Sequence, residues 1–214
     1  MAHPHLPLRT GSASSPIRCA ILISGSGSGM EAMIRHQQTN LDCGHQTVLV
    51  LSDRPDVMGL KRAAHLGVES VCVPLPSITD RSECRLQHEQ AIQKHLELAE
   101  VELVLLSGYM RLVTSFLINN WPKRLLNIHP SLLPAFPGAH AHKDVLAAGV
   151  KVSGCTVHYV DEGMDTGAIL AQRRVPVFLG DDTGSLAERV KVEEHVLYPM
   201  VVDSLVSSLL EKVD

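Results

Sequence analysis

The chain has 214 residues, of which 45% are hydrophobic and 20% are charged, a balance that excludes a disordered chain. Its net charge is −4 and its aromatic content is 3%, so it lacks both the basic surface and the stacking side chains of a nucleic-acid binder. No apolar run approaches the ~20 residues that cross a bilayer, and the negative charge disfavours an anionic membrane surface. We therefore expect no nucleic-acid partner and no membrane partner.

The cysteines and the first residues bear on the cellular compartment. Five cysteines without a C-x-x-C pair form neither an even disulfide framework nor a thiol-rich zinc site, so reduced thiols in a cytoplasmic protein are expected. Residues 1–16 contain Pro, His and Ser but not the apolar segment of a secretory signal. These features predict a flexible N-terminal tail over residues 1–16 and a single domain over residues 17–214.

Strand-like and helical segments alternate from residue 17 onward. Short apolar runs predict strands at Ile17–Ile23, Thr47–Leu51, Ser70–Val73, Glu102–Ser107 and Leu125–His129. Helices are expected between them at Met30–Gln38, Val57–Leu66 and Glu83–Glu100. Strands that alternate with helices of ten or more residues indicate right-handed crossovers and a mostly parallel central sheet flanked by helices.

The last third of the chain has a different pattern. Two long strand-like runs, Val152–Val160 and Ala168–Phe178, are separated by a short polar segment, which predicts an antiparallel C-terminal hairpin. One closing helix is expected over Thr183–Leu210, with a kink or break at Pro199. The fold class is therefore α/β, with a Rossmann-like sheet in the N-terminal part and a departure from pure βαβ order in the C-terminal part.

A glycine-rich loop follows the first expected strand and precedes the first expected helix. It comprises Gly25, Ser26, Gly27, Ser28 and Gly29. Backbone amides of such a loop can turn toward an anion, and the helix N-terminus adds the positive end of its dipole. The Rossmann pattern is incomplete and the Walker lysine is missing. The loop predicts a small phosphate-bearing ligand, with a tight turn capped by polar residues as the alternative.

Asn127 and His129 form the second candidate site. Residues i and i+2 of a strand point to the same face, and the carboxyl end of a parallel strand is where α/β sheets bind ligands. An amide donor beside an imidazole can hold the oxyanion of an acyl-transfer intermediate while the imidazole moves protons. A histidine at a strand end is also commonly a core or loop residue, so these residues alone leave both interpretations open.

The segment Asn127-x-His129-Pro130-Ser131-Leu132-Leu133-Pro134 resembles the signature of the formyltransferases that use 10-formyltetrahydrofolate. Further matching segments follow the family's order, namely Gly108-Tyr109-Met110-Arg111, Pro137-Gly138-Ala139-His140, Thr156-Val157-His158-Tyr159-Val160 and Asp165-Thr166-Gly167. The resemblance extends from about Ile17 to Met200 and is strongest to the members that formylate glycinamide ribonucleotide in purine synthesis. It implies the family's Rossmann-like formyltransferase fold, with phosphate bound by the N-terminal half and folate by the C-terminal half.

The resemblance implies a reaction without a covalent enzyme intermediate. The amine of glycinamide ribonucleotide would attack the formyl carbon of 10-formyltetrahydrofolate, which serves as a co-substrate. Asn127 would hydrogen-bond the formyl oxygen, and His129 would stabilise the oxyanion and donate a proton to the departing N10. Asp165 would raise the pKa of His129 and relay protons through a bound water, although by itself it is equally well read as a turn residue. Neither a metal nor ATP is expected.

The resemblance also implies the residues that bind the two substrates. The ribonucleotide phosphate would lie on the loop Gly25–Gly29, with Lys191 and Glu194 near the ribose and glycinamide, where surface helix charge is the alternative interpretation. Arg81 would lie near the glutamate tail of the folate. The pterin would lie between two segments, one formed by Met110, Arg111, Leu112 and Val113, the other by Asp161, Glu162, Gly163, Met164 and Asp165.

The resemblance also gives two histidines supporting roles, and the sequence departs from the family pattern at two places. His140 and His158 are expected near the reaction centre, and His140 with His142 is not expected to hold a metal because no carboxylate or cysteine cluster accompanies them. Gly29 stands where the family commonly has asparagine, and Cys84 and Arg85 stand where relatives often have an aromatic residue. A side-chain contact to the phosphate is expected to be lost at Gly29.

Other functions on this scaffold remain as alternatives. Methionyl-tRNA formyltransferase carries an extra C-terminal domain and formyltetrahydrofolate hydrolase an N-terminal regulatory domain. A length of 214 residues disfavours both full-length arrangements, whereas a truncated relative, such as a formyltetrahydrofolate hydrolase, stays an alternative. A formyltransferase with another amine acceptor, or a folate- or nucleotide-binding protein without activity, is a further alternative. Mere binding does not need a proton relay, so the set of Asn127, His129 and Asp165 favours the transferase. The resemblance leaves a homodimer open.

Overall fold

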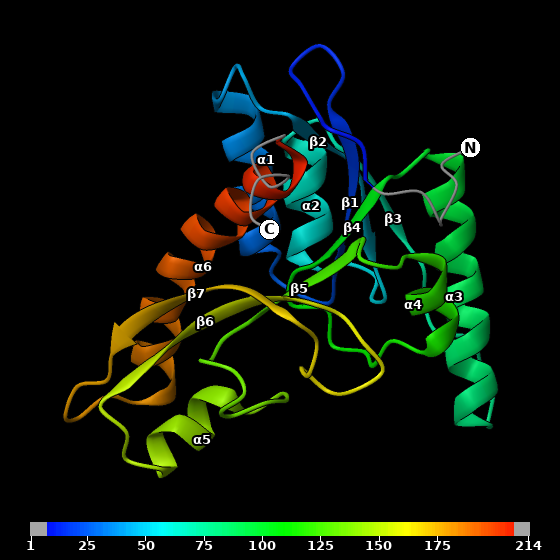
Figure 1. The fold of residues 1–214 in the computed structure, drawn as a ribbon. Helices are drawn as coiled ribbons and strands as arrows, with labels where there is room; N and C mark the ends of the chain where they lie inside the picture. Colours follow the sequence, from blue (N-terminus) through cyan, green and yellow to red (C-terminus); the bar gives the residue numbers. More distant parts are fainter. Residues whose placement is uncertain (1–7, 208–214) are drawn as a thin grey trace.

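A computed structural model describes residues 8–207 of the chain, which form one seven-stranded sheet covered by helices (Figure 1). The strands are β1 (Ile17–Ile23), β2 (His45–Ser52), β3 (Glu69–Cys72), β4 (Leu103–Leu106), β5 (Leu125–His129), β6 (Val152–Tyr159) and β7 (Ile169–Pro176). The helices are α1 (Ser28–Thr39), α2 (Met58–His65), α3 (Arg81–Leu98), α4 (Ser115–Asn120), α5 (Ala141–Ala147) and α6 (Thr183–Val206). Among the described residues, no helix combines the length and apolar character needed to cross a membrane.

The sheet has the order β3-β2-β1-β4-β5-β6-β7. Strands β1 to β5 pair in parallel, whereas β6 and β7 are antiparallel to their neighbours. The predicted mostly parallel sheet with an antiparallel C-terminal hairpin is therefore confirmed. The chain reverses its direction of travel across the sheet between β1 and β4, and such a switch point opens a crevice at the carboxyl ends of the strands.

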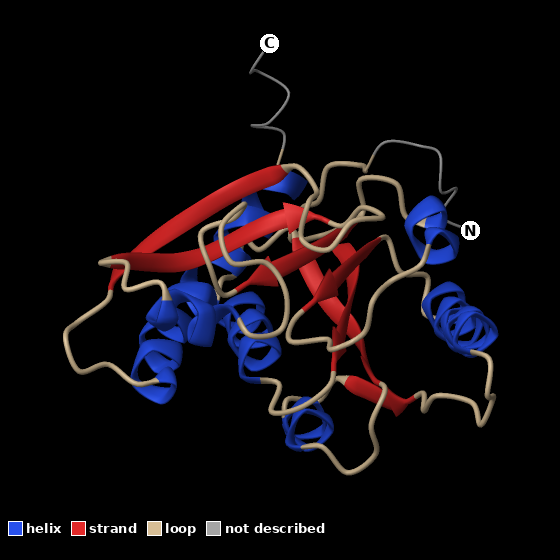
Figure 2. Cartoon of the chain, turned by 90° about the horizontal axis from the view of Figure 1, so that it is seen from below, coloured by secondary structure: helices blue, strands red, loops and turns tan. Residues whose placement is uncertain are grey.

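Both faces of the sheet are covered, and β1 is apolar and buried at every position except Arg18. Helices α1, α2 and α6 lie on one face, and α3 and α4 lie on the other (Figure 2). Alternate residues of β1 belong to the two cores, Ile21 to the first and Leu22 to the second. A central parallel strand buried on both faces reads as a continuous hydrophobic run, which is how its position was predicted.

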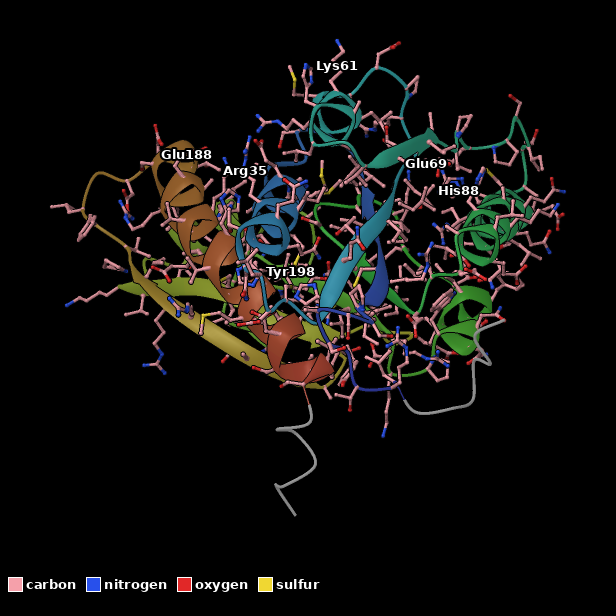
Figure 3. All side chains as sticks on the ribbon, turned by 90° about the horizontal axis from the view of Figure 1, so that it is seen from above. Arg35, Lys61, Glu69, His88, Glu188 and Tyr198 are labelled. Carbon is pink, nitrogen blue, oxygen red and sulfur yellow. The ribbon has the colours of Figure 1, made fainter. Side chains whose placement is uncertain are left out.

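The expected break of the last helix at Pro199 is wrong, because α6 continues through this residue to Val206. Pro199 is buried, and neighbouring side chains hold the helix against the sheet. Tyr198 points from α6 toward the sheet (Figure 3), and its hydroxyl donates a hydrogen bond to the carbonyl oxygen of Leu126 at 3.1 Å. Burial of Tyr198 and Val202 offsets the one helical hydrogen bond that a proline cannot make. The expected helix end at Leu210 lies outside the described residues.

Part of the predicted flexible tail is also wrong, because residues 8–16 are held against the domain. The amide of Gly11 donates to the carbonyl oxygen of Val206 at 2.8 Å, and Arg9 forms an ion pair with Glu102 at 2.6 Å. A Cβ atom on Gly11 would lie 2.0 Å from the carbonyl oxygen of Gly44, so the close backbone approach requires glycine here. Residues 1–7 of the predicted tail lie outside the described residues.

The loop after β1 packs tightly against the start of α2. Gly27 has φ 69°, and a Cβ atom on it would lie 2.6 Å from the Cα atom of Gly59. The amide of Gly59 in turn donates to the carbonyl oxygen of Gly25 at 3.0 Å. The loop therefore needs glycine for two reasons, its left-handed backbone and the neighbouring backbone beside it.

We expect Gly27→Ala to lower the free energy of unfolding by about 2–4 kcal/mol, because backbone strain and a steric overlap add. The matched control is Gly67→Ala, since Gly67 has φ 73° with open space around the position of a Cβ atom. Backbone strain alone should cost that variant about 1–2 kcal/mol. Urea unfolding measures both values, and equal losses would show that contact with Gly59 does not constrain the loop.

Candidate active site

A cleft of about 950 Å³ opens at the carboxyl ends of β1, β4 and β5. Its walls come from four segments that are distant in sequence, residues 24–29, 106–115, 127–130 and 160–165, with further residues from α5 and α6. The glycine-rich loop, the Asn127 and His129 strand end, and the two expected folate segments therefore line one cavity. Its position is that of a ligand site in an open α/β sheet.

His129 lies at the end of β5 with both ring nitrogens engaged. Its Nε2 is 2.9 Å from the carbonyl oxygen of Phe136, and its Nδ1 is 3.2 Å from Oδ2 of Asp165. The hydroxyl of Ser131 donates to the same Phe136 carbonyl at 3.0 Å. Both partners of the ring can only accept, and the neutral ring has one proton, so we assign that proton to Nε2, which makes the shorter contact; a second proton on Nδ1 would let the imidazolium donate to Asp165 as well. Nδ1 is therefore the atom of His129 that takes up and releases a proton.

Asp165 lies in the β6–β7 loop and receives contacts on both carboxylate oxygens. Its Oδ2 accepts a hydrogen bond from the amide of Gly138 at 2.8 Å, and its Oδ1 is 3.6 Å from Nε2 of His158. Burial, the largest influence, acts to raise the pKa of Asp165. The contact with His158, the hydrogen bond from Gly138 and the charges that the two nearby imidazoles can carry together outweigh burial and lower this pKa. The carboxylate is therefore ionised at neutral pH.

Burial also dominates the pKa of His129, and here it lowers the pKa. The ring is almost fully buried, which penalises the imidazolium and lowers the pKa below its usual value. The Phe136 carbonyl and Asp165 act in the raising direction, as expected for Asp165, but do not compensate. Asp165 therefore acts on His129 in the expected direction, but burial keeps the pKa below its usual value, and His129 is neutral at pH 7 in the unliganded protein.

Asn127 and His158 complete this cluster from neighbouring strands. The β5–β6 register sets Asn127 directly opposite His158. Nδ1 of His158 is 2.8 Å from the Tyr159 carbonyl oxygen and therefore carries the proton, which leaves Nε2 to accept from the Asn127 amide at 3.2 Å. The Nδ2 atom of Asn127 is also 3.4 Å from Oδ1 of Asp165. The structure thus places Asn127, His129, His158 and Asp165 in one contiguous network.

Two expected residues do not line the cleft, and a neighbour takes the place of each. His140 is exposed at the N-cap of α5, whereas His142 lines the cleft and has a pKa lowered by burial and by His129 and Lys191. Arg81 is exposed at the first position of α3, whereas Arg85, one turn later, lines the cleft. Neither difference had a signal in the sequence. Helix α5 was not predicted, so His140 and His142 could not be placed on a helix face, and Arg81 and Arg85 both lie near the start of one predicted helix.

One end of the cleft combines the glycine-rich loop with α6. Gly25, Ser26, Gly27, Ser28 and Gly29 face Lys191 and Glu194 across it. The loop leads into α1, whose first amides and dipole favour an anion. A Cβ atom on Gly29 would lie 2.5 Å from Oγ of Ser107. A side chain at position 29 would therefore require the hydroxyl of Ser107 to move.

Glu194 belongs to this end of the cleft and has a shifted pKa. Burial raises the pKa of its carboxyl to about 7, and the ammonium of Lys191 acts in the lowering direction. The charge of Glu194 therefore changes within the physiological range. This shift gives the end of the cleft beside the glycine-rich loop its own pH response.

The opposite end of the cleft has half-exposed apolar side chains on both sides. Met110 and Leu112 follow β4, and Met164 faces them from the β6–β7 loop. The guanidinium of Arg111 is held by Asp53, because its Nε donates to the buried Oδ2 of that residue at 2.6 Å. Unpaired apolar surface beside loop backbone suits a flat heterocycle, which stacks on the side chains and hydrogen-bonds at its edge.

Comparison with known proteins assigns the chain to a family. A sequence model described as "Formyl transferase" matches residues 17–202. The chain belongs to the formyl transferase family. Its similarity is to the phosphoribosylglycinamide formyltransferases, of which that of Bacillus subtilis is 42% identical over 87% of this chain and 93% of its own length.

Longer relatives and solved structures support the same family assignment. The trifunctional purine biosynthetic protein adenosine-3 of Drosophila melanogaster is 41% identical over 89% of this chain, which spans only 14% of that relative's length. The crystal structure of phosphoribosylglycinamide formyltransferase from Brucella melitensis is 41% identical, with a TM-score of 0.82 over 90% of this chain and 97% of that chain. The crystal structure of glycinamide ribonucleotide transformylase 1 from Geobacillus kaustophilus is 37% identical, with a TM-score of 0.83.

Proposed function

We propose that this protein transfers the formyl group of 10-formyltetrahydrofolate to the amine of glycinamide ribonucleotide, a step of purine biosynthesis in the cytoplasm. The observation that carries the proposal is the network of Asn127, His129 and Asp165 midway along a cleft with two chemically different ends. One end has the backbone amides and charges that suit a phosphorylated ribose. The other has the apolar surface that suits a pterin. The named relatives match nearly the whole chain and support the same pair of substrates.

The two ends dictate how the substrates lie. The ribonucleotide phosphate accepts hydrogen bonds from the loop amides at the start of α1, and Glu194 accepts from the ribose hydroxyls. The pterin lies between the segment after β4 and residues 161–165, with Met110 and Met164 against its faces. Arg85, rather than Arg81, meets the negatively charged tail of the folate. This arrangement brings the amine and the formyl carbon together beside His129.

The formyl transfer begins when the amine attacks the formyl carbon, which forms a C–N bond and moves charge onto the formyl oxygen. The Nδ2 amide of Asn127 donates to this oxyanion and stabilises it. Nδ1 of His129, unprotonated in the free protein, accepts the proton that the new ammonium releases. The imidazolium formed beside Asp165 adds positive charge next to the oxyanion.

Collapse of the tetrahedral intermediate then breaks the bond between the formyl carbon and N10. The imidazolium of His129 returns its proton to N10, through a water bonded to Asp165 where the distance requires one. Tetrahydrofolate leaves with this proton, the formyl group remains on the former amine, and the ring of His129 is neutral again. One residue thus acts first as a base and then as an acid, which a pKa below the usual value permits.

A spectrophotometric assay of folate deformylation tests the proposal, with 10-formyl-dideazafolate in the presence and absence of glycinamide ribonucleotide. We expect deformylation that requires the ribonucleotide and yields one formylated product per folate consumed. Deformylation without the ribonucleotide would instead identify a hydrolase. A folded protein that is inactive with this amine would identify a different acceptor or a binding protein, and either result would overturn the proposal.

The pKa of Glu194 predicts how the affinity for the ribonucleotide depends on pH. We expect the KM for glycinamide ribonucleotide to rise as the pH falls from 8 to 6, because protonation removes a charged acceptor. Glu194→Gln should raise KM by about 10-fold at pH 8, the difference between a charged and a neutral hydrogen bond. The variant should also lose the difference between pH 8 and pH 6 that the wild type shows.

Titration of the substrate itself is the same for both proteins, so the ratio of their KM values isolates Glu194. A ratio that stays constant from pH 6 to pH 8 would remove Glu194 from ribonucleotide binding.

A further inference from the structure

Four side chains with metal-binding atoms meet at the end of the sheet that is remote from the cleft. They are His36 on α1, Cys43 in the following loop, His45 at the start of β2 and Asp203 on α6. One ligand atom from each lies within 4.8 Å of the others. We propose that these four residues bind a zinc ion that ties α6 to α1 and β2.

The donor set and its spacing fit Zn²⁺. One thiolate, two imidazoles and one carboxylate are ligands that zinc combines in four-coordinate sites. Nε2 of His36 is 2.8 Å from Oδ2 of Asp203, Nε2 of His45 is 2.9 Å from Oδ1, and Sγ of Cys43 is 3.8 Å from Oδ1. A tetrahedral zinc site separates its ligand atoms by about 3.3–3.6 Å, given the usual bond lengths. Shifts of less than about 1 Å therefore convert this cluster into a coordination shell.

The cluster is separate from the formyl-transfer cleft. His45 lies at the amino end of β2, whereas the cleft lies at the carboxyl ends of the parallel strands. Asp203 follows Glu194 by nine residues of α6, which is about 14 Å along the helix. With all four positions supplied by protein atoms, zinc here has a structural role rather than a catalytic one.

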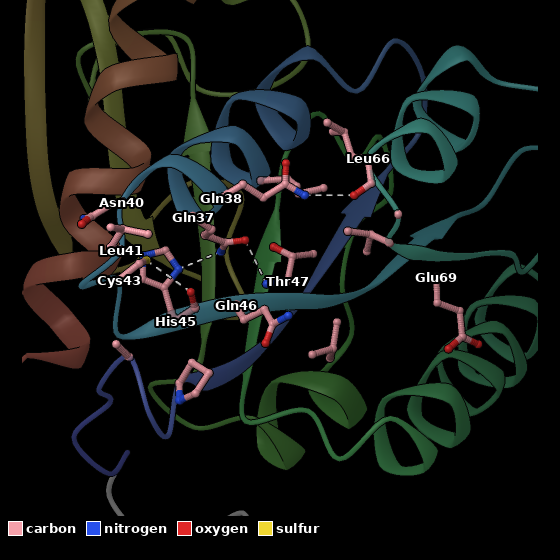
Figure 4. A pocket seen from close by; sticks show the side chains of 16 residues that line it. Gln37, Gln38, Asn40, Leu41, Cys43, His45, Gln46, Thr47, Leu66 and Glu69 are labelled. Carbon is pink, nitrogen blue, oxygen red and sulfur yellow. Dashed lines mark hydrogen bonds between the residues drawn. The ribbon is translucent and has the colours of Figure 1, made fainter.

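A second cavity gives the ion a route to the cluster. This cavity has a volume of about 600 Å³, and both Cys43 and His45 belong to its wall (Figure 4). The side chain of Asp203 is one-third exposed, and that of His36 is 29% exposed. The ligands are thus reachable from solvent, although the ring of His45 is itself buried.

Gln37 controls whether His45 can take part. Its Oε1 accepts from the amide of Thr47 at 2.9 Å, and its Nε2 donates to Nδ1 of His45 at 2.8 Å (Figure 4). This pairing places the ring proton of His45 on Nε2, the atom that zinc needs. When the metal binds, the proton moves to Nδ1 and the amide turns over, which sacrifices the bond to Thr47. A carboxylate at position 37 would accept from both partners and remove this conflict.

Metal titrations of the intact, chelator-treated protein test the proposal. We expect one equivalent of Zn²⁺ to bind in competition with a chromophoric chelator, and Co²⁺ to give the charge-transfer absorption of a cobalt–thiolate bond. Loss of a second-shell partner alone costs about 10- to 100-fold in affinity, so Cys43→Ser should lower zinc affinity by at least about 100-fold and abolish the band. Cys84→Ser, at a free cysteine on α3, is the matched control and should leave both unchanged.

Gln37→Glu provides the sharper test, because a cluster that is merely hydrogen-bonded predicts no gain in zinc affinity. We expect zinc to bind this variant about 10-fold more tightly than the wild type. If Cys43→Ser does not fold, His36→Gln, at a half-exposed position, replaces it and should weaken zinc in the same way. No cobalt–thiolate band in the wild type, or zinc binding that Cys43→Ser and His36→Gln leave intact, would overturn the proposal. Added zinc should raise Tm without changing the rate of formyl transfer, so this result is independent of the proposed activity.

Discussion

Replacement of His129 by alanine is expected to lower kcat for formyl transfer by about 10³- to 10⁴-fold, because one side chain supplies the proton acceptor, the proton donor and part of the oxyanion stabilisation. KM for both substrates should change little, since the ring lies at the middle of the cleft and not at the ends that bind phosphate and pterin. Steady-state kinetics with each substrate varied in turn measure both quantities.

His140→Ala is the matched control for this loss, since His140 is an exposed histidine of the same region that does not line the cleft. Its kcat should stay near that of the wild type. Thermal unfolding of both variants separates a chemical effect from a loss of fold. A folded His129→Ala variant that retains more than a tenth of wild-type kcat would exclude His129 as the proton carrier.

Replacement of Asp165 by asparagine is the second change with a large expected effect, a decrease in kcat of about 10²- to 10⁴-fold. Asparagine has nearly the same shape and can still accept from the amide of Gly138 through its Oδ1 atom. The variant therefore keeps the loop in place but removes the negative charge 3.2 Å from His129. The imidazolium that forms during the reaction loses its stabilising partner.

The pH profile of the Asp165→Asn variant tests this electrostatic role. Below the pKa of His129 its ring is protonated before the substrates bind and cannot accept a proton, so kcat/KM falls on the acid side. The carboxylate raises the pKa of His129, and its removal therefore lowers that pKa and moves the acid limb to lower pH. The wild-type limb belongs to the coupled pair and not to either residue alone. An acid limb that remains in place would contradict a direct interaction between the two groups.

The sequence allowed the sheet to be predicted far better than the shorter helices. β5 begins and ends at the predicted residues, because a short run with three apolar residues ends abruptly at a proline-rich loop. Helix α4 has only six residues and α5 only seven, too few for a helical periodicity to show. The hydrogen bond of Gly11 with Val206 joins residues near the two ends of the described range, and a contact between residues so far apart in sequence leaves no local pattern.

The site was predicted where a motif carries the chemistry and missed where packing decides. Asn127, His129 and Asp165 form the expected network because two of them share a strand face and a family signature. His142 and Arg85 were missed because helix rotation decides which of two similar side chains lines a cleft. The His36 and Asp203 pair spans 167 positions of the chain, a distance at which the sequence gives no indication of contact.

The contact between Gly11 and Val206 has a consequence for how the domain can be joined to other chains. Gly11 precedes the amino end of β1, and Val206 lies in the last turn of α6. Both are therefore on the side of the sheet away from the cleft. A short linker between these two segments should therefore permit circular permutation, and a fused partner attached at either one would not block substrate access. The same geometry suits a catalytic unit that occupies 14% of a longer polypeptide, as the matching segment does in the Drosophila relatives.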